Sequence, residues 1–254
     1  MIWLPISFFI TAALYASVGF AGGSTYNALL VLAGTDYRIL PTIALLCNLI
    51  VACGGTYRFA RAGHVEIVRI APWIVTSVPA AWLGGYLHVS ETVFVGLLGL
   101  SLLAAGLRMF FKKSDEIVLE KSSAYKWKPL APLIGMTMGL LAGLVGIGGG
   151  IFLAPVLHLL RWDNAKKIAA MCSVFILVNS IAGLAGQAMK LSDTQLLADI
   201  TPYWILFPAV LIGGQIGSYM GVVRLNPDML RVLTALLILY VSGRLLLRWY
   251  GMVS

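Results

Sequence analysis

Charged side chains are scarce in this chain and are missing from long stretches of it. Only 11% of the 254 residues are Asp, Glu, Lys or Arg, while 60% are hydrophobic. Residues 70–107, 129–160 and 191–223 contain no Lys or Arg. A helix needs roughly 20 predominantly apolar residues to cross a bilayer core about 30 Å thick. The sequence therefore predicts an all-α polytopic membrane protein, with no room for a water-soluble catalytic domain.

Carboxylates are absent from the middle of the expected membrane spans. All ten Asp and Glu residues fall in expected loops or at expected helix ends. Transporters of protons and cations usually place carboxylates within the bilayer, where charge is costly and therefore functional. We therefore expect no carboxylate proton relay. The net charge of +8 has a simple explanation, because cytoplasmic loops of membrane proteins collect Lys and Arg.

Cysteine and histidine are too few and too scattered to suggest a metal site or a disulfide framework. Three Cys and three His occur, without metal-ligand spacing. The sequence also lacks an H-E-x-x-H motif, a nucleophile elbow and paired carboxylates inside an apolar span. We therefore expect no enzyme activity, no cofactor and no bound metal. Cys47, Cys53 and Cys172 leave a thiol-dependent permease open as an alternative.

Glycine, in contrast, is abundant and is arranged in a repeat. The block G-F-A-G-G-S-T-Y-N-A-L-L at 19–30 returns 127 residues later as G-I-G-G-G-I-F-L-A-P-V-L at 146–157. Each block interrupts an apolar stretch, where unsatisfied backbone groups are costly in lipid. Broken apolar segments in corresponding positions of two halves indicate a transporter binding site. The sequence therefore predicts two homologous transmembrane repeats, 1–110 and 129–254, joined by a polar cytoplasmic linker at 111–128.

Five helical segments are expected in each half. They cover 3–18, 22–34, 39–58, 70–88 and 91–110, then 129–145, 150–160, 165–188, 200–222 and 229–250. If each glycine break turns the chain back, the halves are inverted and 14 of the 18 basic residues lie in the cytoplasm. If each broken segment crosses once, eight spans with parallel halves leave 12 there. The positive-inside rule favours inverted repeats, each with a Gly-broken re-entrant or discontinuous pair and three full spans.

The glycine blocks also offer a way to bind an anion without a buried cation. A helix that begins directly after such a break presents unpaired N–H groups and about half a positive charge at its N-terminus. Two such ends near the bilayer midplane could hold an oxyanion. The simpler alternative is that the glycines only permit close helix packing, and the matched pair favours a functional role. The candidate substrate-binding residues are Gly22, Gly23, Ser24, Thr25, Asn27, Asn48, Gly148, Gly149, Gly150, Ser173 and Asn179.

At the glycine blocks the chain resembles the TauE/SafE sulfite-exporter-like permeases. The signature of that family is a G-x-G-G-G run followed five residues later by Pro-x-Leu, and the second block matches it through Pro155 and Leu157. The first block departs from it, because Ala21 and Ala28 replace a glycine and the proline. The resemblance implies a permease of the bacterial inner membrane for a small anion such as sulfite, a sulfonate or sulfoacetate. It fixes neither the substrate nor the direction, since the family contains importers and exporters.

Three modes of transport fit these observations. Our leading prediction is a secondary transporter that works by alternating access around the two broken helices. The alternatives are a thiol-dependent, thiosulfate-type permease and an anion channel or facilitator without coupling. We expect a small anion and the lipid bilayer as partners, and no nucleic acid. The sequence leaves the coupling ion and the oligomeric state open, a homodimer included.

Overall fold

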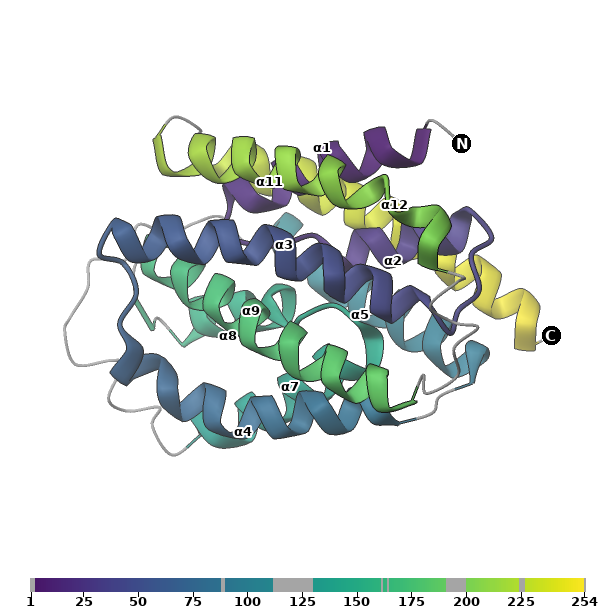
Figure 1. Cartoon of the computed structure of the whole chain (residues 1–254), viewed down its shortest axis with the longest axis horizontal. Helices are drawn as coiled ribbons and strands as arrows, with labels where there is room; N and C mark the ends of the chain where they lie inside the picture. The colour runs from purple at the N-terminus through teal and green to yellow at the C-terminus, as the bar shows by residue number, and fades with distance from the viewer. Residues whose placement is uncertain are drawn as a thin grey trace.

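Helices make up all the regular structure in the described part of the chain, which the computed structural model gives as residues 3–87, 90–111, 130–160, 162–163, 165–190, 200–223 and 227–253 (Figure 1). In the first half they are α1 (Trp3–Ser17), α2 (Gly23–Leu32), α3 (Leu40–Arg61), α4 (Ile67–Tyr86) and α5 (Glu91–Phe111). In the second half they are α7 (Ala131–Val145), α8 (Gly150–Leu159), α9 (Ala165–Lys190), the 3-10 helix η1 (Thr201–Tyr203), α11 (Leu206–Val223) and α12 (Pro227–Val253).

The ten segments expected from the sequence correspond to these helices, with one difference in the second half. The expected helix 200–222 is interrupted between η1 and α11. Pro208, in the first turn of α11, has no N–H group to donate to the carbonyl oxygen of Trp204, so this helical hydrogen bond across the interruption cannot form. The linker expected at 111–128 lies outside the described residues, apart from Phe111.

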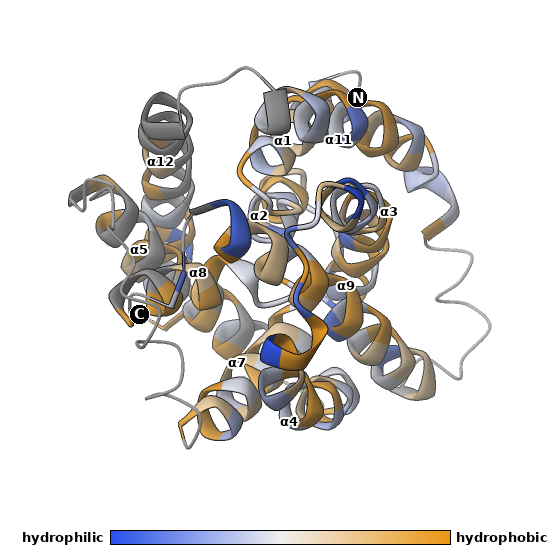
Figure 2. Ribbon diagram, turned by 90° about the vertical axis from the view of Figure 1, so that its left-hand side faces the viewer, coloured by the Kyte–Doolittle hydropathy of each residue, from blue (hydrophilic) through white to orange (hydrophobic). Residues whose placement is uncertain are grey.

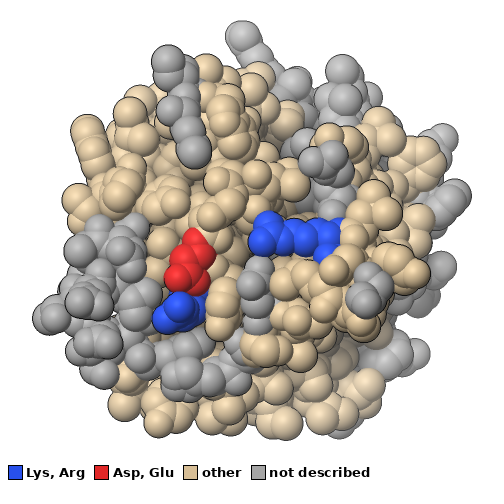
Figure 3. Space-filling model, turned by 90° about the vertical axis from the view of Figure 1, so that its right-hand side faces the viewer, with Lys and Arg blue, Asp and Glu red and all other residues tan. Residues whose placement is uncertain are grey.

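Four stretches of the described chain are long and apolar enough to cross a membrane. They are Leu40–Arg61, Ile67–Tyr86, Lys166–Met189 and Thr201–Gly221. Large apolar side chains remain exposed on them, among which Val68, Val75 and Ile181 are each more than half exposed. Figure 3 shows few charged side chains among the described residues of one face. An apolar outer surface of this kind suits hydrocarbon rather than water, which agrees with a membrane protein.

The helices pair across the two halves of the chain. α1 packs along α11, α4 along α7, α5 along α12 and α3 along α9, and Figure 2 shows α2 and α8 in the interior between these pairs. A Cβ on Gly143 would lie 1.9 Å from the carbonyl oxygen of Ala81, and one on Gly217 would lie 2.1 Å from that of Ala13. Small residues let membrane helices approach this closely. The seams between α4 and α7 and between α1 and α11 therefore leave no room for a side chain at these glycines.

Both seams join helices that run in the same direction. Successive glycines of α7 contact successive turns of α4: Gly135 meets Trp73, Gly139 meets Ser77 and Gly143 meets Ala81. Successive glycines of α11 contact α1 in the same way: Gly213 meets Phe9, Gly217 meets Ala13 and Gly221 meets Ser17. Because residue numbers rise together along each seam, each pair is parallel. The first helix of each half thus packs along the fourth helix of the other half.

Ion pairs join the first turns of α4 and α9, which belong to different halves, to the connecting segments that precede these helices. Arg69, at the start of α4, donates to a carboxylate oxygen of Asp163 at 2.5 Å. The Lys167 ammonium donates to the carboxylate of Glu66, and the Arg69 guanidinium lies 4.6 Å from the ring centre of Trp162. The hydrogen bond from Lys167, followed by the one from Arg69, lowers the pKa of the Glu66 carboxyl. The segment between α3 and α4 therefore lies beside the segment between α8 and α9.

A second group of contacts brings together three other chain segments. The hydroxyl of Tyr203 in η1 donates to Oγ1 of Thr35, which follows α2, at 3.0 Å. Arg248, near the end of α12, donates to the carbonyl oxygen of Val31 in α2 at 2.9 Å. The end of α2, the short helix η1 and the last turns of α12 are therefore neighbours.

Candidate functional site

Two glycine-rich turns share an unusual backbone conformation. They connect α1 to α2 and α7 to α8, and we call them the first and second glycine turns. Gly19 and Gly22 have φ angles of 84° and 92°, and the residues 127 positions later, Gly146 and Gly149, have φ angles of 73° and 82°. L residues are strained at such angles, whereas glycine adopts them readily. The two turns therefore repeat a backbone geometry as well as a sequence pattern.

Each glycine turn ends at the N-terminus of a short helix. Gly22 is the N-cap residue of α2 and makes no side-chain capping bond. Its carbonyl oxygen accepts the first helical hydrogen bonds, from the amides three and four residues further on, and the carbonyl oxygen of Gly149 does the same for α8. The N–H groups that precede these have no partner within an α-helix. Both turns thus lead to a positively polarised helix end.

The side chain of Asn48, from α3, lies between the two glycine turns. It is fully buried. A Cβ on Gly23 would lie 2.2 Å from Nδ2 of Asn48, and a Cβ on Gly148 would lie 3.2 Å from the same atom. Neither Nδ2 nor Oδ1 has a hydrogen-bond partner among the residues that the structure describes. Leaving a buried polar group unpaired costs about 1–3 kcal/mol, so a ligand or water that paired with this amide would be stabilised.

A hydroxyl group of α9 approaches the same space. Oγ of Ser180 would lie 3.0 Å from a Cβ on Gly148, and it too is buried without a partner in the described part of the chain. The preceding residue, Asn179, directs its Nδ2 to the carbonyl oxygen of Phe175 in its own helix at 2.8 Å. The residue of α9 that faces the second glycine turn is thus Ser180, and not Asn179, which the sequence predicts as a site residue. We call Gly23, Asn48, Gly148 and Ser180 the central site.

The polar side chains that follow the first glycine turn contact neighbouring helices. The hydroxyl oxygens of Tyr15 and Thr25 are 2.8 Å apart and link α1 to α2. Nδ2 of Asn27 donates to the carbonyl oxygen of Val145 at 2.6 Å and links α2 to the end of α7. Ser24 is buried beside them. These contacts fix the position of α2 and hence of the helix end that borders the central site.

Ser173 and Gly150 contact other parts of the protein. Oγ of Ser173 is 3.1 Å from Oγ1 of Thr56 and would lie 2.8 Å from a Cβ on Gly55. Thr56, the partner of Ser173, lies eight residues after Asn48 in α3, which is about 12 Å along the helix axis at about 1.5 Å per residue. Gly150, the first residue of α8, packs against the side chain of Ile176. Of the expected residues, the structure therefore brings Gly23, Asn48 and Gly148 into direct contact and places Ser173 beyond them.

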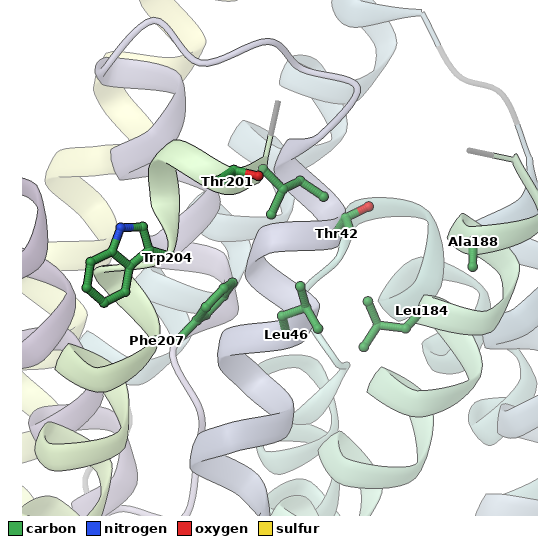
Figure 4. A pocket seen from close by; sticks show the side chains of 8 residues that line it. Thr42, Leu46, Leu184, Ala188, Thr201, Trp204 and Phe207 are labelled. Atoms are coloured by element: carbon green, nitrogen blue, oxygen red, sulfur yellow. The ribbon is translucent and has the colours of Figure 1, made fainter. Parts of the chain in front are cut away.

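A separate cavity of about 520 Å³ opens near the N-terminal end of α3 (Figure 4). Its lining residues are Thr42, Leu46, Leu184, Ala188, Ile200, Thr201, Trp204 and Phe207. None of these is an expected substrate-binding residue, and most are apolar. An anion needs hydrogen-bond donors to offset the cost of leaving water. The chemistry of this cavity therefore suits an apolar group better than a charged one.

The three thiol groups differ in their accessibility. Cys47 and Cys172 are buried, while Cys53 on α3 is exposed. A reactive thiol has to be reached by its substrate, so a thiol-dependent mechanism would rest on Cys53. In the described ranges no three His, Cys, Asp or Glu residues lie close enough together to hold a metal ion.

One protein family and one relative match this chain over almost its whole length, and other relatives match parts of it. The family described as sulfite exporter TauE/SafE matches residues 4–245. A probable membrane transporter protein of Sinorhizobium fredii is 35% identical over 252 residues, which covers 97% of this chain and 98% of the relative. A probable membrane transporter protein of Haemophilus influenzae is 23% identical over 190 residues, with 70% and 69% covered. Another, of Methanocaldococcus jannaschii, is 31% identical over 131 residues, with 50% and 48% covered. No solved structure matches.

Proposed function

Because the chain belongs to the sulfite exporter TauE/SafE family, we propose that it is a multi-pass secondary transporter of the bacterial inner membrane that carries a small anion. The expected cargo is sulfite, a sulfonate, sulfoacetate or a related organic anion. The named relatives are probable membrane transporters rather than enzymes. Support for an anionic cargo comes from the central site.

The observation that carries this proposal is the buried Asn48 amide, which lies between the two glycine turns with no partner among the described residues. An oxyanion held there would accept hydrogen bonds from Nδ2 of Asn48, from the hydroxyl of Ser180 and from backbone N–H groups at the helix ends. Two helix dipoles would favour its charge. Oδ1 of Asn48 can only accept, which suits an anion that carries a proton, such as hydrogen sulfite. The central site could thus bind an anion without a buried Lys or Arg.

Contacts between connecting segments support inverted rather than parallel halves. The segment between α3 and α4, together with the first turn of α4, is joined to the segment between α8 and α9 through Arg69 and Asp163. Inverted halves put both segments in the cytoplasm, whereas eight spans with parallel halves would put them on opposite sides. Hydrogen bonds and ion pairs cannot reach across a hydrocarbon core of about 30 Å. The contact between Tyr203 and Thr35 supports inverted halves in the same way, since the parallel arrangement would place these two residues on opposite sides of the membrane.

In the inverted arrangement the two glycine turns approach the central site from opposite sides of the membrane. One anion is held where they meet, and alternating access requires this point to open to one side at a time. Backbone in the turns lacks continuous helical hydrogen bonds and so changes conformation at lower cost than the helices do. The glycine turns are therefore the parts that we expect to move first.

Uptake of sulfite and short-chain sulfonates by purified protein in proteoliposomes tests the proposal. Asn48→Leu keeps most of the side-chain volume and removes both polar ends, so affinity should fall roughly tenfold or more for each hydrogen bond lost. Gln187→Leu is the matched control, because Gln187 is another buried amide, about 10 Å beyond Ser180 along α9. Unchanged uptake by a well-folded Asn48→Leu protein, or no uptake of any tested anion by the unaltered protein, would contradict the proposal.

A further inference from the structure

A second group of hydrogen-bond donors lies at the C-terminal end of α3. Nη2 of Arg58 donates to Oε1 of Gln215 in α11 at 2.9 Å. The guanidinium carbon lies 5.8 Å from the ring centre of Tyr219, one turn further along α11. Nε of Arg58 is buried and has no hydrogen-bond partner in the part of the chain that is described. Arg58 is thus oriented by neutral groups and retains an unused donor.

Within the described residues, the charge of Arg58 also has no acidic partner. Ion pairs between described residues involve Arg38, Arg69 and Lys167, and within this set Arg58 has no Asp or Glu partner. A half-buried cation has lost part of its hydration. An amide oxygen and an aromatic ring are attracted to the guanidinium but do not cancel its charge. The site therefore has a net positive charge that an anion could neutralise.

Glycine in α3 makes room for the amide beside Arg58. A Cβ on Gly54 would lie 2.2 Å from Nε2 of Gln215, so this carboxamide rests against the backbone of α3. Gly54 and Arg58 are four residues apart and share a face of the helix. Because Oε1 of Gln215 accepts from Arg58, the amide is oriented and its Nε2 group is a second type of donor next to the guanidinium. Charge and donors are therefore combined at one point between α3 and α11.

We propose that Arg58 and Gln215 form a second anion-binding subsite, which takes the same class of small oxyanion as the central site. This inference rests on the proposed transport function. Arg58 lies about 15 Å from Asn48 along the axis of α3, towards the side that the inverted arrangement makes cytoplasmic. A guanidinium can donate two parallel hydrogen bonds to neighbouring oxygens of one anion. The subsite concentrates the anion at the cytoplasmic end of its route, before entry to the central site or after release from it.

A simpler role is available for basic residues at this position, and Arg61 represents it. Cations in the last turn of a helix interact favourably with the helix dipole, and cytoplasmic ends collect them. Arg61 lies in the same last turn as Arg58. Its side chain is exposed, and it donates a long hydrogen bond of 3.5 Å to the hydroxyl of Tyr57. Arg61→Gln therefore removes the same charge without touching the amide of Gln215, which makes it a matched control.

The experiment compares Arg58→Gln, Gln215→Leu and Arg61→Gln in proteoliposomes, with sulfite as the probe and with both orientations of the protein assayed separately. Arg58→Gln should raise the sulfite concentration for half-maximal transport from the cytoplasmic face roughly tenfold. It should also remove most of the salt dependence of that value, because the attraction of the unpaired cation is screened by salt. Gln215→Leu removes the donor that α11 contributes and should also raise this sulfite concentration. Arg61→Gln should change it little.

Direct sulfite binding to the detergent-solubilised proteins, followed by thermal shift, separates this inference from the proposed function. If Asn48→Leu loses transport while Arg58→Gln behaves as Arg61→Gln does, the central site stands and the subsite is wrong. If Arg58→Gln loses binding and Asn48→Leu does not, the subsite stands and the central site is wrong. Loss in neither variant contradicts both. Arg58→Lys retains the charge without the planar fork, and it should restore the salt dependence but only part of the affinity.

Discussion

The side-chain amide of Asn27 donates a hydrogen bond to the carbonyl oxygen of Val145 at 2.6 Å. Asn27 lies in the helix that follows the first glycine turn, and Val145 is the last residue of the helix that precedes the second. The last carbonyl groups of a helix have no partner within it, and here a side chain from the other half supplies one. The two glycine turns are therefore coupled through this bond.

Replacing Asn27 should destabilise the protein through this bond. Asn27→Ala leaves the buried carbonyl of Val145 without its donor, at an expected cost of about 1–3 kcal/mol. Thermal unfolding in detergent measures the loss. Asn179→Ala is the control, since the amide of Asn179 bonds within its own helix and its removal leaves the coupling between the halves intact. Equal losses of thermal stability in the two variants would show that the bond between the halves contributes no more stability than a bond within one helix.

Substitution of Gly149 should impair transport more than substitution of an equally strained glycine elsewhere. A Cβ at Gly149 would meet the ring of Phe175 at 2.8 Å, and its φ angle of 82° disfavours any L residue. Gly34 has a φ angle of 77° and open space around it. Gly34→Ala therefore isolates the backbone strain, about 1–2 kcal/mol. Sulfite flux at matched protein levels compares the two, and equal flux would mean that the second glycine turn has no special role.

Cysteine pairs should report which connecting segments share a side of the membrane. In a protein whose own cysteines are replaced, a short bifunctional thiol reagent should cross-link Glu66→Cys with Lys167→Cys, and likewise Thr35→Cys with Tyr203→Cys, because the native side chains of each pair are in contact. An impermeant maleimide should label the first pair from the cytoplasmic side and the second pair from the other side. Labelling of both pairs from one side would exclude the inverted arrangement.

Removal of the native thiols should leave transport largely unchanged. Cys47 and Cys172 are buried, so a conservative change to Ala or Ser affects packing rather than chemistry, while Cys53 is the accessible thiol. Sulfite and thiosulfate uptake by the triple variant measures the result. If uptake disappears and Cys53→Ser alone reproduces the loss, the thiol-dependent alternative is the better account.

The ion pairs of Glu66 should contribute stability at neutral pH that disappears in acid. The pKa of this carboxyl is lowered below its ordinary value of 4.5, first by the hydrogen bond from Lys167 and then by that from Arg69. A carboxyl with a lowered pKa stabilises the folded state above its unfolded pKa, and this stability is lost as the pH falls through the folded pKa. Melting temperatures of wild type and Glu66→Gln should therefore differ at pH 7 and converge below about 4.5.

The size of that difference should be small, because partly exposed ion pairs contribute about 0–1 kcal/mol. Asp36→Asn, which removes the carboxylate of the exposed pair with Arg38, controls for the loss of a surface charge. If the difference in melting temperature between wild type and Glu66→Gln persists unchanged in acid, the ion pairs of Glu66 are not its source.

The sequence predicts the helical architecture and the apolar spans well, because apolar runs act locally. Asn48 could be proposed as a site residue since it is a polar group deep in an apolar span. The role of Ser180 could not be predicted. Packing against other helices decides whether Asn179 or Ser180 of α9 faces the second glycine turn. The sequence likewise does not reveal that Asn27 bonds to Val145 or that Gln215 orients Arg58, since residues far apart in the chain form these contacts.

The glycine seams have a consequence for how such a protein can arise and be divided. Each seam joins one helix of each half of the chain: α1 with α11, and α7 with α4. Each tightly packed pair therefore contains helices from both halves, and the halves are interlocked as the subunits of a domain-swapped dimer are. One half alone would expose a bare glycine groove, and it could close that groove only by exchanging helices with a second copy.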